Sequence, residues 1–253
     1  MFVPPPAVPF DVNRYLADFR AAAVGAGGRL ETFGEIDGHP LFAWTKRAPG
    51  PRPRIYVSSG MHGDEPAPTL AVLALMRAGF FDDRATWFVC PVLNPVGLER
   101  GTRENGEPRD LNRDYRHCLS HEVRAHTAWL QRQPLFDLTL CLHEDWESHG
   151  FYLYELNPTA RPKLADAMIA AVRALMPIEV AEVIDGRPAD APGIIRPVAD
   201  PLLRDQWPEA IYLRNAHTTL SYTLETPSAL PLGIRVAAQQ AAVQIAIKRL
   251  ARD

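Results

Sequence analysis

Two residues three positions apart, His62 and Glu65, have side chains of the kind that a catalytic metal site needs. They lie in the stretch 58–66 (SSGMHGDEP), between a β-branched and aromatic run at 54–57 and an apolar, helix-forming run at 67–78. An imidazole and a carboxylate supply two of the three protein ligands of a catalytic zinc site, which leaves its fourth position to water. The alternative is an ordinary helix N-terminus, where the helix dipole favours acidic side chains. The pair alone does not decide between these interpretations.

A third ligand and a base are available where two other apolar runs end. His143 follows the run at 136–142, and Glu225 follows the run at 218–224. His143 completes a set of nitrogen and oxygen ligands that suits zinc. A carboxylate in the place of Glu225 can act as a general base and pass its proton to a leaving amine. Taken alone, His143 is better explained as a structural residue and Glu225 as an acid that caps the turn at 226–227.

The polar segment 98–119 holds the remaining candidates. It lacks helical or strand periodicity, and a loop of this length inside a compact domain is usually functional. Arg103 is a candidate to polarise a scissile carbonyl and stabilise its oxyanion. Arg113 can bind a substrate carboxylate in a bidentate fork, and Asn112 can add a hydrogen bond. The alternative for this segment is a solvated, charged loop.

The elements that must position these residues alternate between strands and helices, which predicts an α/β fold with a mainly parallel or mixed sheet. In such sheets ligands bind outside the carboxyl ends of the strands, where His62, Asn94, His143 and Glu225 fall. Residues 177–210 are rich in proline and receive no assignment. Strands are expected at 29–36, 40–46, 54–57, 86–92, 136–142, 151–156 and 218–224, and helices at 12–24, 67–78, 120–132, 159–176 and 232–251.

Length and composition fit one α/β domain over residues 1–253, with 47% hydrophobic residues for its core. No apolar run reaches the ~18 residues of a membrane span. The net charge of −3 and the scattered basic residues argue against nucleic acid and anionic membranes as partners. The N-terminal segment does not resemble a secretory signal, and Cys90, Cys118 and Cys141 are an odd number without paired spacing. We therefore expect a cytoplasmic protein with reduced thiols, and we leave its oligomeric state open.

These candidates, in this order, resemble the zinc metallocarboxypeptidase family that includes the digestive carboxypeptidases. The resemblance spans roughly residues 54–227. It implies a single α/β domain with a central mixed, mostly parallel sheet flanked by helices, and cleavage of a peptide-like amide bond next to a terminal carboxylate. The family also carries a tyrosine upstream of its catalytic glutamate, for which Tyr212 is the candidate. The resemblance implies that His62, Glu65 and His143 bind Zn²⁺, that Arg103 is the electrophilic arginine, that Asn112 and Arg113 bind the carboxylate, and that Glu225 is the catalytic glutamate.

Two branches of the family imply different substrates. The close spacing of Arg103 to Asn112 and Arg113 resembles the bacterial murein peptide amidases, which trim cell-wall peptides. The short segment between Glu65 and His143 resembles instead the succinylglutamate desuccinylase and aspartoacylase branch, which deacylates small N-acyl amino acids. A third hypothesis, a catalytically silent binding domain, is disfavoured because the metal, base and arginine positions are all filled.

Three acidic side chains, Glu144, Asp145 and Glu147, follow His143, the third candidate ligand. Many family members have a serine directly after this ligand, where this chain has Glu144. These acidic side chains either favour a substrate with an ammonium group, as in a diaminopimelate-containing peptide, or are solvated surface charges. Tyr152 and Tyr154 alternate with apolar residues and are expected to pack, with the alternative that one of them lines the substrate pocket. Surface or structural roles are expected for the remaining histidines, which are His39, His117, His121, His126, His149 and His217.

Overall fold

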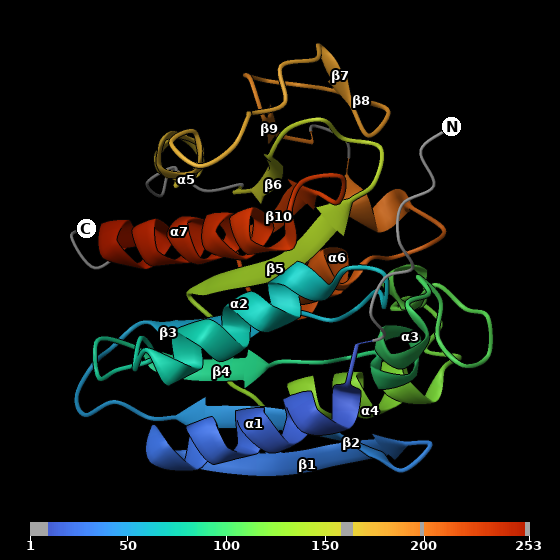
Figure 1. Ribbon diagram of the computed structural model, residues 1–253, viewed down its shortest axis with the longest axis vertical. Coiled ribbons are helices and arrows are strands. Elements are labelled where there is room, and N and C mark those ends of the chain that lie inside the picture. The colour runs from blue at the N-terminus through green and yellow to red at the C-terminus, as the bar shows by residue number, and fades with distance from the viewer. Residues whose placement is uncertain (1–9, 158–163, 198–199, 251–253) are drawn as a thin grey trace.

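A mixed β-sheet runs through the middle of the molecule (Figure 1). The structure is a computed structural model that describes residues 10–157, 164–197 and 200–250. Within these ranges the sheet has eight strands in the order β1-β2-β4-β3-β5-β10-β6-β9. The strands are β1 Arg29–Ile36, β2 His39–Lys46, β3 Arg54–Ser58, β4 Thr86–Cys90, β5 Leu138–Asp145, β6 Tyr152–Leu156, β9 Ile194–Ile195 and β10 Ser221–Pro227, and a separate hairpin is formed by β7 Val183–Ile184 and β8 Arg187–Pro188.

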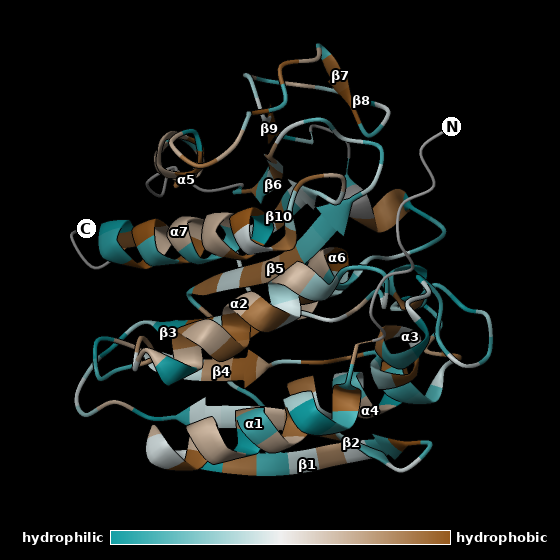
Figure 2. Ribbon diagram, in the orientation of Figure 1, coloured by the Kyte–Doolittle hydropathy of each residue, from teal (hydrophilic) through white to brown (hydrophobic). Residues whose placement is uncertain are grey.

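The four central strands β4, β3, β5 and β10 run parallel, so their carboxyl ends meet at one edge of the sheet. β1, β2 and β6 join with antiparallel pairing, which makes the sheet mixed. Figure 2 shows β5 changing from hydrophobic along its length to hydrophilic at its arrowhead. The polar ends of the central strands are therefore gathered in one place, as expected for a ligand site of an α/β fold.

Helices cover both faces of the sheet because successive strand side chains point to opposite sides. Ile55 and Val57 of β3 belong to the core cluster that includes α1, α2, α5 and α7, whereas Tyr56 belongs to the cluster that includes α4 and α6. α1, α2 and α7 lie on the near face in Figure 1. The helices are α1 Val12–Gly25, α2 Pro66–Arg77, α3 Pro95–Arg100, the 3₁₀ turn η1 Leu111–Arg113, α4 His121–Leu130, α5 Ala165–Val172, the 3₁₀ turn η2 Pro201–Leu203, α6 Glu209–Ala216 and α7 Leu232–Leu250.

The two site strands are longer than their apolar runs. β5 and β10 stay paired in parallel as far as Asp145 and Pro227, so His143 and Glu225 lie inside strands rather than after them. In this register His143 and Glu225 are direct neighbours. The prediction of the strand ends was wrong because backbone pairing between neighbours, which composition does not report, continues beyond the last apolar residue.

The segment 98–119, predicted to be irregular, contains the end of α3 and the turn η1. Asn94 caps α3, since its side chain accepts a hydrogen bond from the N–H of Gly97 and Pro95 occupies the first turn. The expected helix 159–176 is shorter, as α5, and residues 158–163 lie outside the described ranges, as do residues 1–9. The unassigned region 177–210 holds β7, β8, β9, η2 and the start of α6. In the described part of the chain, we find no helix with the length and apolar character to span a membrane.

Candidate active site

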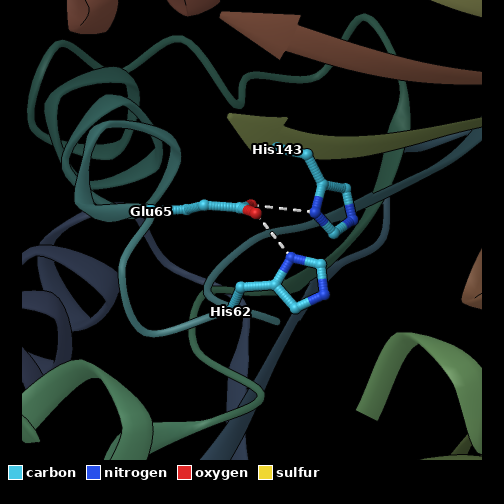
Figure 3. A group of neighbouring side chains, drawn as sticks. All are labelled: His62, Glu65 and His143. Atoms are coloured by element: carbon cyan, nitrogen blue, oxygen red, sulfur yellow. Dashed lines mark hydrogen bonds and ion pairs between the residues drawn. The ribbon is translucent and has the colours of Figure 1, made fainter. Parts of the chain in front are cut away.

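His62, Glu65 and His143 converge at the carboxyl edge of the sheet (Figure 3). Nδ1 of His62 lies 2.5 Å from Oε1 of Glu65, and Nδ1 of His143 lies 2.9 Å from Oε2 of the same carboxylate. All three side chains are buried, and one ligand atom from each lies within 4.8 Å of the others. Two imidazoles and a carboxylate that face one buried point fit the donor set of a catalytic zinc site.

The turn that carries His62 is held by close backbone contact. A Cβ atom added to Gly63 would lie 1.8 Å from the carbonyl carbon of Gly97, so this approach tolerates no side chain at Gly63. The N–H of Gly63 donates a hydrogen bond of 2.9 Å to the carbonyl of Thr102. The segment 95–103, which begins with α3 and which we call the strap, is thereby fixed against the turn that carries His62. The strap brings Arg103 to the same place.

Asp110 and Arg103 surround His62 and Glu65. Nε2 of His62 lies 3.1 Å from Oδ1 of Asp110, which orients the ring with Nδ1 toward Glu65. Arg103 donates to Asp110 from Nε at 3.1 Å and lies 3.4 Å from Glu65 through Nη1. Burial alone would raise the pKa of Glu65, but His62 and His143 hold it well below its usual range.

The surroundings shift the pKa values of the two candidate histidine ligands in opposite directions. Burial lowers the pKa of His62, but Glu65 and the hydrogen-bonded Asp110 outweigh it and raise the pKa to about 9. Burial lowers the pKa of His143, and the opposing charge of Glu65 does not outweigh it. A histidine that binds a metal must be neutral, so a cation bound by both rings would displace any proton from the ligand atoms.

Glu144 lines the cavity but is not a solvated surface charge, one of the two roles considered for it. Its side chain is buried, forms an ion pair with Arg235 of α7, and accepts a 2.7 Å hydrogen bond from the N–H of Ala67 at the start of α2. Gln239 of α7 donates a 2.7 Å hydrogen bond to the carbonyl of His143. These contacts anchor the end of β5 between two helices, so Glu144 supports the position of His143 and its charge is matched by Arg235.

Glu225 is the direct neighbour of His143 in the sheet and lines the same cavity. Among the described residues, no cationic side chain lies within ion-pair distance of its carboxylate. Burial raises the pKa of Glu225 well above its usual range, and the nearby charges of Glu65, Asp145 and Asp185 raise it further. A carboxylate with a raised pKa beside a candidate metal-ligand set is suited to accept and return a proton.

The cavity at this edge has a volume of about 370 Å³, which suits a small molecule or the end of a peptide. Every site candidate named from the sequence lines it except Tyr212; those that do are His62, Glu65, Arg103, Asn112, Arg113, His143 and Glu225.

Tyr212 is the one candidate that the structure does not bring into the cavity lining with the others. Its ring packs against Tyr115 and His217, each with a centroid distance of 5.7 Å. Tyr152 and Tyr154 pack as expected, Tyr152 in a buried cluster and Tyr154 against it, and both also line the cavity. They lie on β6, which pairs with β10 so that Tyr152 is the partner of Glu225. Their alternation in the sequence was visible, but which face of β6 meets the cavity depends on that pairing.

Two arginines that the sequence did not single out line the cavity together with Arg113. Arg187 belongs to β8 and Arg204 follows η2. Burial lowers the pKa of Arg204, and the positive charges of Arg187 and Arg113 lower it further, so the three guanidinium groups lie near one another. In the described ranges none of the three has a carboxylate oxygen within 4.0 Å. A cluster of unpaired positive charges in a cavity is suited to an anionic ligand.

Behind the cavity lies a buried polar cluster that sequence patterns also missed. His126 and Glu209 are each 1% exposed, and Tyr56 lies between them. His126 is structural, one of the roles expected for it. No sequence pattern indicated a role for Glu209, because it lies in the proline-rich region 177–210, whose elements were not assigned.

Acid should destabilise the fold through His126. Burial lowers its pKa to about 3, and nearby His217 contributes in the same direction. Between about pH 6.5, the usual value for histidine, and pH 3, the unfolded chain binds a proton that the folded chain excludes. Stability should therefore fall with decreasing pH by up to about 1.4 kcal/mol per pH unit from this residue. Urea unfolding at pH 7, 6 and 5 should show a shallower pH dependence for His126→Gln than for the wild type, and parallel profiles would contradict the assignment.

The fold is similar to that of solved metallopeptidases and metallo-carboxypeptidases. A candidate metallopeptidase from Shewanella amazonensis superposes with a TM-score of 0.83 at 23% identity, over 96% of this chain and 95% of that one. A metallo-carboxypeptidase from Burkholderia cenocepacia gives a TM-score of 0.73 at 20% identity, over 97% of this chain and 70% of that one. A metallo-carboxypeptidase from Pseudomonas aeruginosa, solved with (2-guanidinoethylmercapto)succinic acid, gives a TM-score of 0.68 at 18% identity, over 96% of this chain and 69% of that one.

The chain belongs to the succinylglutamate desuccinylase/aspartoacylase catalytic-domain family, which matches residues 51–251. No protein of curated function matches it by sequence. The predicted fold class and the resemblance to the carboxypeptidase and desuccinylase branches are confirmed.

Proposed function

We propose that this protein hydrolyses a peptide-like amide bond next to a terminal carboxylate, with a zinc ion held by His62, Glu65 and His143. The observation that carries the proposal is the convergence, in one cavity, of this ligand set with a neighbouring base and a carboxylate-binding pair. When bound, zinc supplies Lewis acidity, which polarises a carbonyl and lowers the pKa of water.

Glu225 and Arg103 carry the chemical step in this proposal. The raised pKa of Glu225 lets it take a proton from the attacking water and return it to the leaving nitrogen. Arg103 has N–H groups left over from its contacts with Asp110 and Glu65. These groups can bind the substrate carbonyl oxygen as negative charge develops on it.

Asn112 and Arg113 hold the free carboxylate of the substrate. Both line the cavity, and Nη1 of Arg113 donates a 2.9 Å hydrogen bond to the backbone carbonyl of Asn112. This contact leaves the rest of the guanidinium fork for a bidentate pair with a carboxylate. An enzyme that fixes this carboxylate cuts the bond beside it, so we expect terminal residues to be removed rather than internal bonds to be cleaved.

A cell-wall-derived peptide is one candidate substrate. Asp145 and Glu147 line the cavity and can face an ammonium group such as that of a diaminopimelate-containing peptide. An N-acyl amino acid with an additional acidic group is the second candidate, supported by Arg187 and Arg204, which add positive charge beyond Arg113. The compound bound by the Pseudomonas aeruginosa carboxypeptidase is likewise a succinic acid derivative.

A substrate panel tests the function and separates the two candidates. It contains short peptides, including a diaminopimelate peptide, and N-acyl amino acids. Each compound is tested once with a free terminal carboxylate and once with that carboxylate amidated. N-acetyl glutamate is compared with N-acetyl glutamine, which has the same shape without the second acid. We expect hydrolysis of free-carboxylate substrates only. Equal cleavage of amidated substrates would contradict the carboxylate site, and intact zinc without hydrolysis of any compound would revive the binding-domain hypothesis.

The arginine pair makes the second candidate testable on its own. If the substrate carries a second acidic group, Arg187→Gln with Arg204→Gln should lower the glutamate-over-glutamine preference in kcat/KM by at least about ten-fold, since each charge-assisted hydrogen bond contributes about 1.5–3 kcal/mol. Arg173→Gln, at an exposed arginine after α5 and outside the cavity lining, is the matched control. An unchanged preference in the double variant would exclude the acidic N-acyl substrate.

A further inference from the structure

Four buried side chains behind the cavity form one continuous hydrogen-bonded series, which we call the relay: Tyr115, His126, Tyr56 and Glu209. We propose that the relay is a positioning device for the substrate-binding amide of Asn112. The inference rests on the proposed function in one respect, namely that Asn112 contacts the substrate carboxylate.

The relay ends on a buried carboxylate. Oε1 of Glu209 accepts a 2.7 Å hydrogen bond from the hydroxyl of Tyr56, and Oε2 accepts one of 2.8 Å from the hydroxyl of Ser58 in β3. Within the described ranges no cationic side chain lies within 4.0 Å of this carboxylate. A buried carboxylate without a cation depends on such hydrogen bonds, so its position is tightly coupled to its donors.

Once Tyr56 donates to Glu209, the direction of every other hydrogen bond in the relay follows. Tyr56 has one hydroxyl proton, which it donates to Glu209, so Nε2 of His126, at 2.9 Å, must donate to the oxygen of Tyr56. The ring of His126 is neutral, and its other nitrogen, Nδ1, is therefore an acceptor. Tyr115, whose hydroxyl lies 2.6 Å from Nδ1, must donate to it. All the protons of the relay thus point toward Glu209, an arrangement in which successive bonds strengthen one another.

Both ends of the relay are joined to the segment that carries Asn112. At one end, the backbone N–H of Glu209 donates a 2.9 Å hydrogen bond to Oδ1 of Asn112. At the other end, Tyr115 lies three residues after Asn112, and its N–H donates to the carbonyl of Trp207 at 3.2 Å. The segment and the first turn of α6 are thus closed into one ring of contacts.

This ring determines which atoms of Asn112 face the substrate. A backbone N–H can only donate, so the atom of Asn112 that meets Glu209 is the oxygen. The amide NH₂ is then left for the cavity that Asn112 lines, with two donors for a carboxylate. A loosened relay would release this orientation without touching the metal ligands or Glu225. The expected effect is weaker substrate binding rather than slower chemistry.

The test compares Tyr56→Phe and Glu209→Gln with Thr139→Val. Thr139 is the β5 partner of Tyr56 in the sheet, is equally buried, and has a hydroxyl without a hydrogen-bond partner, which makes it a matched control. Tyr56→Phe should raise KM for a free-carboxylate substrate about ten-fold, with kcat within two-fold and zinc content unchanged. Glu209→Gln can still accept a hydrogen bond from Tyr56, so its KM should lie between those of the wild type and Tyr56→Phe. Thr139→Val should match the wild type.

Two NMR readouts need no turnover. In the wild type, ¹⁵N shifts of His126 should show a proton on Nε2 and none on Nδ1 from pH 5 to 9, and the opposite tautomer would overturn the relay. The side-chain NH₂ of Asn112 should shift on titration with N-acetylglycine but not with its carboxamide, and this response should weaken in Tyr56→Phe.

The outcomes distinguish a failure of the positioning role from a failure of the proposed carboxylate site. If the wild type binds N-acetylglycine and Tyr56→Phe binds it equally with an unchanged KM, the positioning role is wrong and the proposed function stands. If the wild type neither binds N-acetylglycine nor hydrolyses any free-carboxylate substrate, the carboxylate site itself is wrong, and the positioning role falls with it.

Discussion

Glu225→Gln should lower kcat by about 10³-fold, within the range of about 10²–10⁴ that general acid–base catalysis provides, and leave the zinc content unchanged. Glutamine keeps the shape of the side chain but cannot take up a proton at neutral pH. Glu225 lies beside His143 in the sheet but is not one of the three residues whose ligand atoms converge. Single-turnover hydrolysis and elemental analysis of the same preparation measure the two effects together.

Glu182→Gln is the control for that variant, since Glu182 is an exposed glutamate that does not line the cavity. It should keep wild-type turnover, which would show that the loss in Glu225→Gln is not a general effect of removing negative charge. Full activity in Glu225→Gln would remove the assigned role. Loss of zinc from Glu225→Gln would make Glu225 a ligand instead of a base.

Arg103→Met should lower kcat by about 10²–10³-fold, the usual effect of removing one donor to a developing oxyanion. Arg103 lies 3.1 Å from Asp110 and 3.4 Å from Glu65, so its guanidinium is held in place before substrate binds. Arg103→Lys keeps the charge but lacks the fork of donors, and it should recover only part of the rate.

The matched control for Arg103 is Arg100→Met, an exposed arginine in α3 of the same strap. Its kcat and KM should equal those of the wild type. If Arg103→Met raises KM and leaves kcat unchanged, Arg103 binds the substrate equally in the ground state and the transition state, and the oxyanion role is excluded.

The parts of the site that could be predicted are those that depend on short stretches of sequence. His62 and Glu65 share one turn, and the runs before and after it have clear strand and helix composition. The ends of the runs before His143 and Glu225 were recognisable, although both residues lie inside their strands. Their contact as direct neighbours could not be predicted, because register between strands separated by about eighty residues leaves no local pattern.

The parts that could not be predicted depend on tertiary placement. Arg187 lies in a two-residue strand and Arg204 just beyond a 3₁₀ turn, and such short elements have no periodicity to detect. Glu209 begins a helix without a capping side chain, directly after Pro208. Tyr212 was favoured by its place upstream of the catalytic glutamate, whereas the helix that carries it turns its ring away from the cavity.

The most direct test of the central claim is zinc content by elemental analysis, on the wild type and on His143→Ala prepared side by side. His149→Ala, which removes an exposed histidine six residues away, is the matched control. We expect about one zinc per chain in the wild type and in His149→Ala, and its loss in His143→Ala, because a catalytic site rests on three protein ligands. No metal in the wild type, or undiminished zinc in His143→Ala, would contradict the metal centre on which the proposed roles of Glu225, Arg103 and Asn112 depend.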